Sequence, residues 1–417
     1  MAKIKKIVAR EILDSRGHPT IEVFVQLDDE AIGIFSPPSG ISVGKSEALE
    51  VRDRDPARYA GLGVLKNLEV IVTVIAPRLM GLDAKEQAQI DGILINIDGT
   101  GNKAKLGSNT TLALSGAIVE AQAASEKKPP YLYVSQLLGK TDKAFAIPTP
   151  MFNILNGGKH GSGNLDFQEF MVVPPKANPY SKNLQIGVEC YYSLKETLKS
   201  HSASTLVGDE GGYAPNLYSN MDALKIIEEA VNKAAYRLGL DVFLSLDVAA
   251  SSILQGSSYR IKDKPVPLTS NDFIDFYITL NEQYHLLSLE DPLEENDWDG
   301  WKTLMTKLGG ETLIVGDDLI ATNPERLQKA ISQKACNSIV VKPNQIGTIT
   351  EALKVVKLAK ENKFKIIVSH RSGETNDDFI ADFAVGVEAD YVKFGAPARG
   401  ERVAKYNRLL EIEHELS

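Results

Sequence analysis

The segment VFLSLD (242–247) opens a series of six short apolar runs that extends to Lys393, and each run leads into a residue that can do chemistry. Runs of four to six residues rich in Val, Ile and Leu, apolar on both faces, are typical of buried parallel strands. The segments between them have helical periodicity. This alternation predicts a β/α barrel. The runs and the residues after them are VFLSL (242–246) with Asp247, LLSL (286–289) with Glu290, TLIVG (312–316) with Asp317, NSIVV (337–341) with Lys342, KIIVS (365–369) with His370, and DYV (390–392) with Lys393.

Three of these residues, Asp247, Glu290 and Asp317, are carboxylates on consecutive predicted strands. Because catalytic groups of a β/α barrel lie at the carboxyl ends of its strands, we expect them in one site. Their mutual repulsion is costly unless a cation lies among them, and oxygen ligands without Cys favour Mg²⁺ over zinc. The alternative is that each acid caps the helix that follows it. That explanation is adequate for one acid and weaker for three in succession.

The next two lysines, Lys342 and Lys393, lie on either side of His370 in the series. A strand-end lysine near a metal can be a base, because burial and neighbouring cations lower its proton affinity. The alternative is an ordinary lysine whose stem lies on the barrel rim. That alternative suits Lys393, which ends a shorter run, better than Lys342.

An anion site is indicated at SHRSG (369–373), where arginine and hydroxyl donors lie beside a glycine. Two further acids, Glu169 and Glu210, are candidates for the opposite side of the barrel mouth, although each alone is more simply a carboxylate facing solvent. A lysine base, an opposing acid and a divalent-cation site together indicate metal-assisted removal of a proton next to a carboxylate. Divalent cations would stabilise the resulting enolate.

The composition describes a globular protein with enough apolar residues for a large core. The 417 residues suit a barrel of roughly 250 residues plus a smaller domain. A net charge of -9 argues against nucleic acid or an anionic membrane as a partner. Cys190 and Cys336 have no CxxC partner, so we expect buried thiols and neither a disulfide framework nor a zinc site. The chain has no apolar signal or membrane-spanning run, which predicts a cytoplasmic location.

The chain before the barrel is predicted to form an α+β capping domain of three strands and three to four helices. The expected strands are 4–13, 20–27 and one after Asp28-Asp29, and a turn-rich loop that we expect to be mobile spans 36–45. Helical spacing covers 65–79, 84–95, 108–124 and 132–138. We expect the boundary between 135 and 145, which divides the chain into 1–138, the capping domain, and 139–417, the catalytic barrel.

The barrel half of the chain contains clear helix signals and two further glycine-rich loops. The loops are NGGKHGSG (156–163), followed by Gln168 and Glu169, and VGDEGG (207–212). Helices are expected at 184–200, from Ser219 or Asn220 to Gly239, and after the caps at Asn323 and Thr348.

Ten segments spread over nearly the whole chain form a recognisable set. They are AREILDSRGHPTIEV, PPSGISVGKSEALEVRD, NGGKHGSGNLDFQEFM, VGDEGGYAPN, LDVAAS, LEDPLEENDW, VGDDL, KPNQIGT, SHRSGET and KFGAPARGERVAKYN. Through these segments the chain resembles the enolase family, and a Lys or His base with one or two Mg²⁺ ions is the known pattern of the enolase superfamily. The resemblance implies an enolase-type TIM-like barrel and the reversible, Mg²⁺-dependent dehydration of 2-phosphoglycerate to phosphoenolpyruvate in glycolysis and gluconeogenesis.

The same resemblance implies a role for each site residue. Asp247, Glu290 and Asp317 would hold the tighter Mg²⁺, and Ser42 a second one that arrives with substrate. Lys342 corresponds to the base that removes the C2 proton. Glu210, helped by Glu169, corresponds to the acid that protonates the leaving 3-hydroxyl. The substrate-binding positions are His160, Gln168, Glu169, Lys342, His370, Arg371, Ser372 and Lys393, with Arg371 and Ser372 at the phosphate.

A few positions depart from the family pattern. His18 stands where Asn is usual, and Ile41 and Val43 stand where Ala and Thr are usual in the loop that bears Ser42. Family members form homo-oligomers, dimers or octamers, in which Glu22 meets an Arg near the C-terminus and Arg10 meets a Glu. Those positions look like Glu411 and His414 here, which predicts rearranged dimer contacts.

Two other functions remain as alternatives. One is a catalytically silent enolase relative with a structural or surface-binding role, but such a protein is expected to lack a ligand or Lys342. The other is a superfamily member that acts on a different carboxylate, which the SHRSGET and GDEGG segments disfavour.

Overall fold

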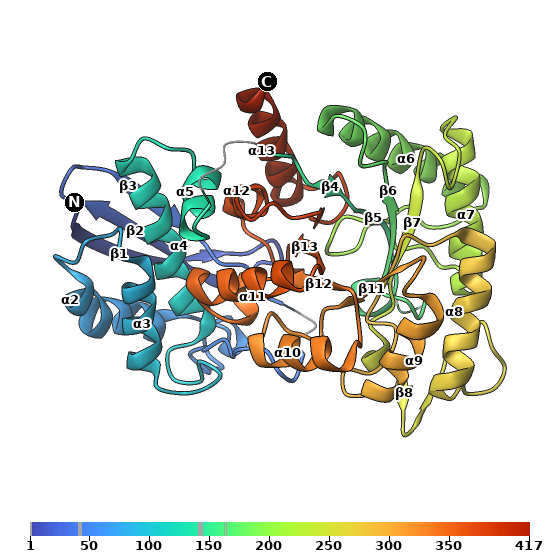
Figure 1. The fold of residues 1–417 in the computed structure, drawn as a ribbon, viewed down its shortest axis with the longest axis horizontal. Helices are drawn as coiled ribbons and strands as arrows, with labels where there is room; N and C mark the ends of the chain where they lie inside the picture. Colours follow the sequence, from blue (N-terminus) through green and yellow to red (C-terminus); the bar gives the residue numbers. More distant parts are fainter. Residues whose placement is uncertain (1, 41–43, 141–144, 162, 164) are drawn as a thin grey trace.

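The computed structural model describes residues 2–40, 44–140, 145–161, 163 and 165–417. It consists of an N-terminal α+β domain and a C-terminal β/α barrel, drawn at the left and right of Figure 1. The predicted fold class is therefore confirmed. The boundary at 138/139 stays a prediction, within the stretch between the last N-terminal helix and the first barrel strand.

The N-terminal domain is built on an antiparallel sheet in the order β1-β2-β3. Alternate side chains of β2 are fully buried because they face helix α4, whereas the other face of the sheet is more exposed. Gly33 allows the helix to approach, since a Cβ there would lie 2.1 Å from the carbonyl oxygen of Ala117. The strands are β1 (Ile4–Leu13), β2 (Pro19–Leu27) and β3 (Ile32–Phe35).

The helices of this domain follow the prediction with two differences. The expected helix 65–79 contains a π-helical segment, η2 (Ile71–Ile75), which ends two residues before Pro77, a residue with no N–H to donate to the preceding turn. The expected helix 84–95 begins later, at Gln87. The elements are η1 (Tyr59–Gly61), α1 (Leu65–Val70), α2 (Ala76–Leu79), α3 (Gln87–Asp98), α4 (Ser108–Ser125) and α5 (Pro130–Leu137).

The barrel sheet, within the described residues, has the order β4-β14-β13-β12-β11-β10-β7-β6-β5. Its two edge strands are separated along the chain only by Met151, whose N–H donates to the carbonyl of Val392 at 2.8 Å, so the sheet closes. The strands are β4 (Thr149–Pro150), β5 (Phe152–Asn156), β6 (Glu169–Val173), β7 (Phe243–Asp247), β10 (Ser288–Glu290), β11 (Leu313–Gly316), β12 (Ser338–Val341), β13 (Lys365–Ser369) and β14 (Tyr391–Lys393).

One strand of the barrel runs against the others. The six predicted runs pair in parallel, as expected, but β6 pairs antiparallel with both β5 and β7. The first residue of β6, Glu169, therefore lies at the same edge of the sheet as the last residue of β7, Asp247. This reversal, which apolar patterning does not reveal, brings the QE pair at 168–169 to the catalytic edge.

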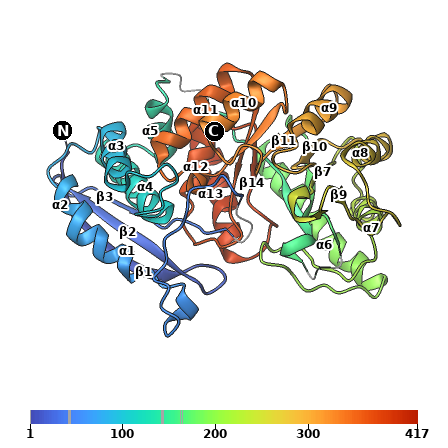
Figure 2. The ribbon, with the colours of Figure 1, turned by 90° about the horizontal axis from the view of Figure 1, so that it is seen from below.

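Helices cover the outside of the barrel strands (Figure 2). The predicted caps at Ser219, Asn323 and Thr348 are confirmed. Helix α7 ends before Gly239, because Ala235 adopts a left-handed conformation and the next N–H donates back to Val231. The helices are α6 (Tyr180–Ser200), α7 (Asn220–Lys233), α8 (Ser270–Tyr284), α9 (Trp298–Leu308), α10 (Pro324–Gln333), α11 (Ile349–Glu361), α12 (Phe379–Gly386) and α13 (Gly400–Leu416).

Short elements complete the barrel domain, and two of them carry site residues. His160 is the last residue of η3, and η5 follows Lys342 directly. The 3-10 turns are η3 (Gly158–His160), η4 (Ala250–Ser252) and η5 (Pro343–Gln345), and the small ribbon consists of β8 (Leu254–Gln255) and β9 (Ser258–Tyr259).

The barrel interior has its own apolar core. This packing explains why the strands are apolar on both faces, since the opposite faces pack under the helices. The interior core consists of Met151, Met171, Val173, Val315, Val340 and Ile367.

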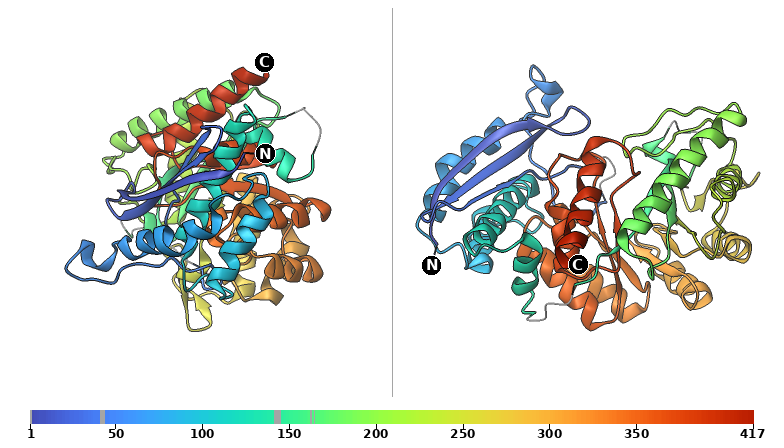
Figure 3. Two further views of the ribbon diagram at one scale, coloured as in Figure 1. Left: turned by 90° about the vertical axis from the view of Figure 1, so that its left-hand side faces the viewer. Right: turned by 90° about the horizontal axis from the view of Figure 1, so that it is seen from above.

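The N-terminal domain docks on the start of α11. Ile349 N–H donates to Ser115 Oγ and Thr350 N–H to Asp91 Oδ2, both at 3.0 Å. On another side of the barrel α13 lies against α6, as both views of Figure 3 show. The two hydrogen bonds to the start of α11 thus join the capping domain to the barrel, whereas the α13–α6 contact lies within the barrel domain.

The two thiols agree with the sequence analysis. Cys190 and Cys336 are both buried and unpaired. No helix in the described part of the chain is long and apolar enough to cross a membrane.

Candidate active site

A polar cavity lies at the edge of the barrel where the parallel strands end. Most of the residues predicted from the sequence line this cavity. They are His160, Gln168, Glu169, Glu210, Asp247, Asp317, Lys342, His370, Arg371, Ser372 and Lys393.

The ammonium of Lys393, at the end of β14, is surrounded by carboxylates. Its Nζ lies 2.7 Å from Glu290 Oε1, 3.2 Å from Asp247 Oδ2 and 3.3 Å from Glu169 Oε2. Burial alone would lower the pKa of Lys393, but the acids raise it well above its usual value. Burial raises the pKa of Glu290 to about 8, and repulsion from Asp247 adds to the effect. Lys393 is therefore a fixed cation and not a base.

The second lysine, Lys342, forms an ion pair with Asp317 Oδ2. The other oxygen of Asp317 accepts a hydrogen bond from Gln345 Nε2 at 3.0 Å. Burial lowers the pKa of Lys342, but the neighbouring acids, Asp317 foremost and Glu290 with it, raise it overall above its usual value. The sequence argument, that the surroundings lower its proton affinity, therefore does not hold while Asp317 is its partner.

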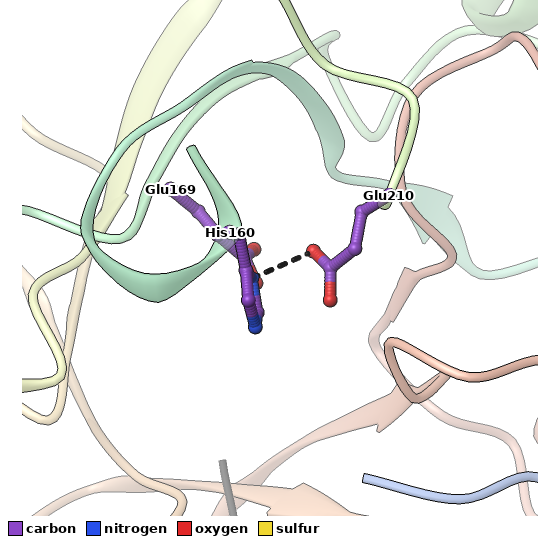
Figure 4. A group of neighbouring side chains, drawn as sticks. All are labelled: His160, Glu169 and Glu210. Atoms are coloured by element: carbon purple, nitrogen blue, oxygen red, sulfur yellow. Dashed lines mark ion pairs between the residues drawn. The ribbon is translucent and has the colours of Figure 1, made fainter. Parts of the chain in front are cut away.

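Next to Lys393, His160, Glu169 and Glu210 form a buried cluster (Figure 4). His160 Nδ1 lies 3.3 Å from Glu210 Oε2 and 3.8 Å from Glu169 Oε1, and Asn153 Nδ2 donates to Glu210 at 3.0 Å. Burial raises the pKa of Glu169 well above its usual value. Burial would also raise the pKa of Glu210, but two imidazoles lower it well below its usual value. The cluster can therefore hold a proton on Glu169 beside an ionised Glu210.

The predicted anion site lies on the loop after β13. The guanidinium of Arg371 is buried against Glu47, with Nη1 donating to Oε2 at 2.7 Å and to Asn344 Oδ1 at 3.2 Å. A Cβ at Gly40 would lie 2.0 Å from Arg371 Nη2, so only glycine allows this approach. The segments on both sides of residues 41–43 thus contact the anion loop. Ser42, a predicted metal ligand, lies outside the described residues.

The acidic groups of the cavity fit a divalent cation. Asp291, Asp317 and Asp318 have carboxylate oxygens within 4.8 Å of one another. The buried Oε2 of Glu290 has no hydrogen-bond partner among the described residues, and a cation would satisfy it. Asp247 and Glu290 are adjacent in register, as predicted, but Lys393 joins them, whereas Asp317 pairs with Lys342.

The sequence analysis missed three acids. Asp291 and Asp318 line the cavity, and each follows a predicted strand-end acid directly, so doubled acids at strand ends were the available signal. Glu47 gave no such signal, because it comes from the other domain and reaches Arg371 only through the fold.

Comparison with known families agrees with this geometry. The family model of the enolase N-terminal domain matches residues 4–134, and that of the enolase C-terminal TIM barrel domain matches residues 144–417. The chain belongs to the enolase family. It is accordingly an enzyme of the enolase superfamily, and its polar cavity at the strand ends corresponds to a small-molecule site.

Proposed function

We propose that the chain is a phosphopyruvate hydratase, which dehydrates 2-phosphoglycerate reversibly to phosphoenolpyruvate with Mg²⁺ as cofactor. The observation that carries the proposal is the arrangement of a lysine–carboxylate pair, Lys342 with Asp317, facing the cavity that also contains the Glu169–Glu210 cluster. A β-elimination from a carboxylate needs these two kinds of group, a base for the C2 proton and an acid for the leaving hydroxyl.

The proposed base is Lys342. An ammonium cannot accept a proton, and its ion pair with Asp317 favours the ammonium form. Lys342 therefore becomes a base only when Asp317 is engaged elsewhere. As a proposed metal ligand, Asp317 has such a second partner, which links metal occupancy to the availability of the base.

The proposed acid is Glu210, helped by Glu169. The group that protonates the leaving 3-hydroxyl must itself carry a proton at that moment. Glu169 retains a proton because it is buried, and both carboxyl groups contact His160 Nδ1. The proton can thus be shared between the two carboxyl groups next to the hydroxyl.

The proposed ligands of the first Mg²⁺ are Asp247, Glu290 and Asp317, and Ser42 is proposed for a second that arrives with substrate. Carboxylate oxygens suit Mg²⁺, and the unpartnered Glu290 Oε2 supports a cation here. When bound, Mg²⁺ compensates the acids and stabilises the negative charge that develops on the substrate.

The remaining polar residues are proposed to bind and orient the substrate. Arg371 and Ser372 would hold the phosphate, since a guanidinium binds phosphate with two parallel hydrogen bonds. His160, Gln168, His370 and Lys393 would orient the rest of the molecule. The cytoplasmic location of the enzyme and its assembly as a homo-oligomer, a dimer or an octamer, also stay predictions.

The experiment that tests the function is the absorbance of phosphoenolpyruvate formed from 2-phosphoglycerate. We expect formation with Mg²⁺ and none after chelation of the metal. Absence of product with Mg²⁺ present, in protein shown to be folded, would refute the proposal.

A further inference from the structure

One buried cation near the site has no part in the function proposed above. Arg402, on α13, is fully buried. Its guanidinium donates to His370 Nδ1 at 2.6 Å, Arg371 O at 2.5 Å, Ser372 O at 2.7 Å and Asp209 O at 3.2 Å. These four acceptors fix the position of the guanidinium. They also depend on it, because removing a donor would leave a buried acceptor unsatisfied.

The contact with His370 determines which ring nitrogen carries the proton. A guanidinium only donates hydrogen bonds, so Nδ1 must accept and cannot be protonated. In the neutral ring the proton is then on Nε2, which lies 3.6 Å from Glu210 Oε2. Burial, with the nearby Arg402 charge adding to it, lowers the pKa of His370 to about 3 despite Glu210. His370 is therefore neutral and presents an N–H to the cavity.

The other three bonds join two loops of the site. Asp209 precedes the proposed acid, Glu210, and Arg371 and Ser372 form the proposed phosphate site. Gly395 makes room for this arrangement, since a Cβ there would lie 2.7 Å from Glu210 O and 3.0 Å from His370 Cε1. One guanidinium thus sets the positions of both loops relative to each other.

We propose that Arg402 is a positioning residue that fixes His370 as the Nε2–H tautomer and holds the Glu210 loop against the anion loop. Its effect on turnover rests on the proposed dehydration, whereas the tautomer does not. A ring locked in this state donates from Nε2 toward Glu210 and toward a ligand in the cavity, and the opposite tautomer would present a lone pair there.

The first experiment reads the tautomer directly. Protein labelled with ¹⁵N-histidine gives ring-nitrogen chemical shifts, and His370→Gln assigns the signal among the six histidines. We expect an unprotonated Nδ1 and a protonated Nε2 in the wild type at neutral pH without substrate. A protonated Nδ1, alone or in an imidazolium, would overturn the inference, whatever activity the enzyme has.

The second experiment removes the donor. Arg402→Met should lose the fixed tautomer and lower kcat by roughly tenfold to a hundredfold, and Arg402→Lys, which keeps one donor, should fall between it and the wild type. Arg408→Met is the matched control, because Arg408 is a largely buried arginine of α13 that pairs with Asp382. Arg408→Met should leave the His370 tautomer unchanged and should change kcat by less than twofold.

The outcomes separate this inference from the proposed function. A folded Arg402→Met variant in which either readout stays at the wild-type level overturns the positioning role. If Arg402→Met does not fold, the wild-type tautomer and the Arg402→Lys variant test the positioning role instead. If 2-phosphoglycerate is not dehydrated by the wild type, the proposed function fails while the tautomer still tests the contact with Arg402.

Discussion

Glu169 lies directly opposite Asp247, because β6 runs antiparallel to β7. The two carboxylates approach the same ammonium, Lys393 Nζ, at 3.3 and 3.2 Å. This pairing connects the proposed acid cluster on one side of the cavity with the proposed metal ligands on the other. The two sides are proposed to act in different steps, so substitutions outside this shared contact should affect different measurements.

Lys342→Ala should abolish exchange of the C2 proton of 2-phosphoglycerate with solvent, because the proposed base acts before the hydroxyl leaves. Mg²⁺ binding should remain largely intact, since Lys342 is not a ligand. Exchange is measured by NMR in deuterated buffer and metal binding by calorimetry. Exchange at the wild-type rate would exclude Lys342 as the base.

Glu210→Gln should block dehydration and spare part of the C2 proton exchange. A glutamine side chain can still accept the hydrogen bond from Asn153 Nδ2, but it cannot deliver a proton to the leaving hydroxyl. The same two assays measure both steps. If this variant and Lys342→Ala lost exchange and dehydration equally, with metal still bound, the division of roles would be wrong.

Glu290→Gln should weaken Mg²⁺ binding by about tenfold or more, because it removes a charged oxygen ligand. Titration calorimetry without substrate measures the change. Glu295→Gln is the control, because Glu295 is similarly buried but pairs with Lys45 and not with Lys393. Equal weakening in both variants would point to a general effect of charge.

Lys360→Met should stabilise the protein at pH 7. Burial and the neighbouring Lys140 lower the pKa of Lys360 from 10.5 to about 8. The folded state then binds this proton more weakly than the unfolded state, so stability is reduced below about pH 8 and recovers as the pH rises toward 10.5. We expect a gain of about 1 kcal/mol at pH 7, discounted for solvent screening because Lys360 is only half-buried, and a smaller gain at pH 10.

Urea unfolding at the two pH values measures this gain. Glu388, which both lysines contact, keeps Lys140 as its partner in the variant. Lys307→Met, which removes an exposed lysine paired with Asp275, should change stability by less than about 0.5 kcal/mol. A loss of stability in Lys360→Met at pH 7 would contradict the predicted direction of the change in unfolding free energy.

The protein should be a homo-oligomer whose charged contacts differ from the family pattern. Arg10 pairs with Glu22 within the chain, and Glu411 lies 3.2 Å from Arg408, so the charges that would oppose each other across a two-fold axis already have partners. The exposed Leu13 and Ile34 offer apolar area nearby.

Light scattering at micromolar concentration, at low and high salt, measures the assembly. Leu13→Glu should weaken it more than Val72→Glu, an exposed valine of η2. A monomer at both salt concentrations would refute the prediction, and an oligomer strengthened by salt would indicate screened like-charge contact.

The amino-acid sequence by itself determined the barrel and the residues at its strand ends. Apolar runs of strand length alternate with helical periodicity, and both patterns are local, so they can be read without knowing which segments meet. The parallel order of the six runs, and the gathering of Asp247, Glu290, Asp317, Lys342, His370 and Lys393 at one edge, follow from that alternation.

The tertiary structure alone decided the partners of those residues. The reversal of β6, the Glu47–Arg371 pair between domains and the Arg402–His370 contact join segments far apart in the chain. The direction in which the pKa of Lys342 is shifted depends on the nearness of Asp317, because burial and ion pairing act on this pKa in opposite directions. Such effects depend on distance and exclusion of water, which no local pattern of residues encodes.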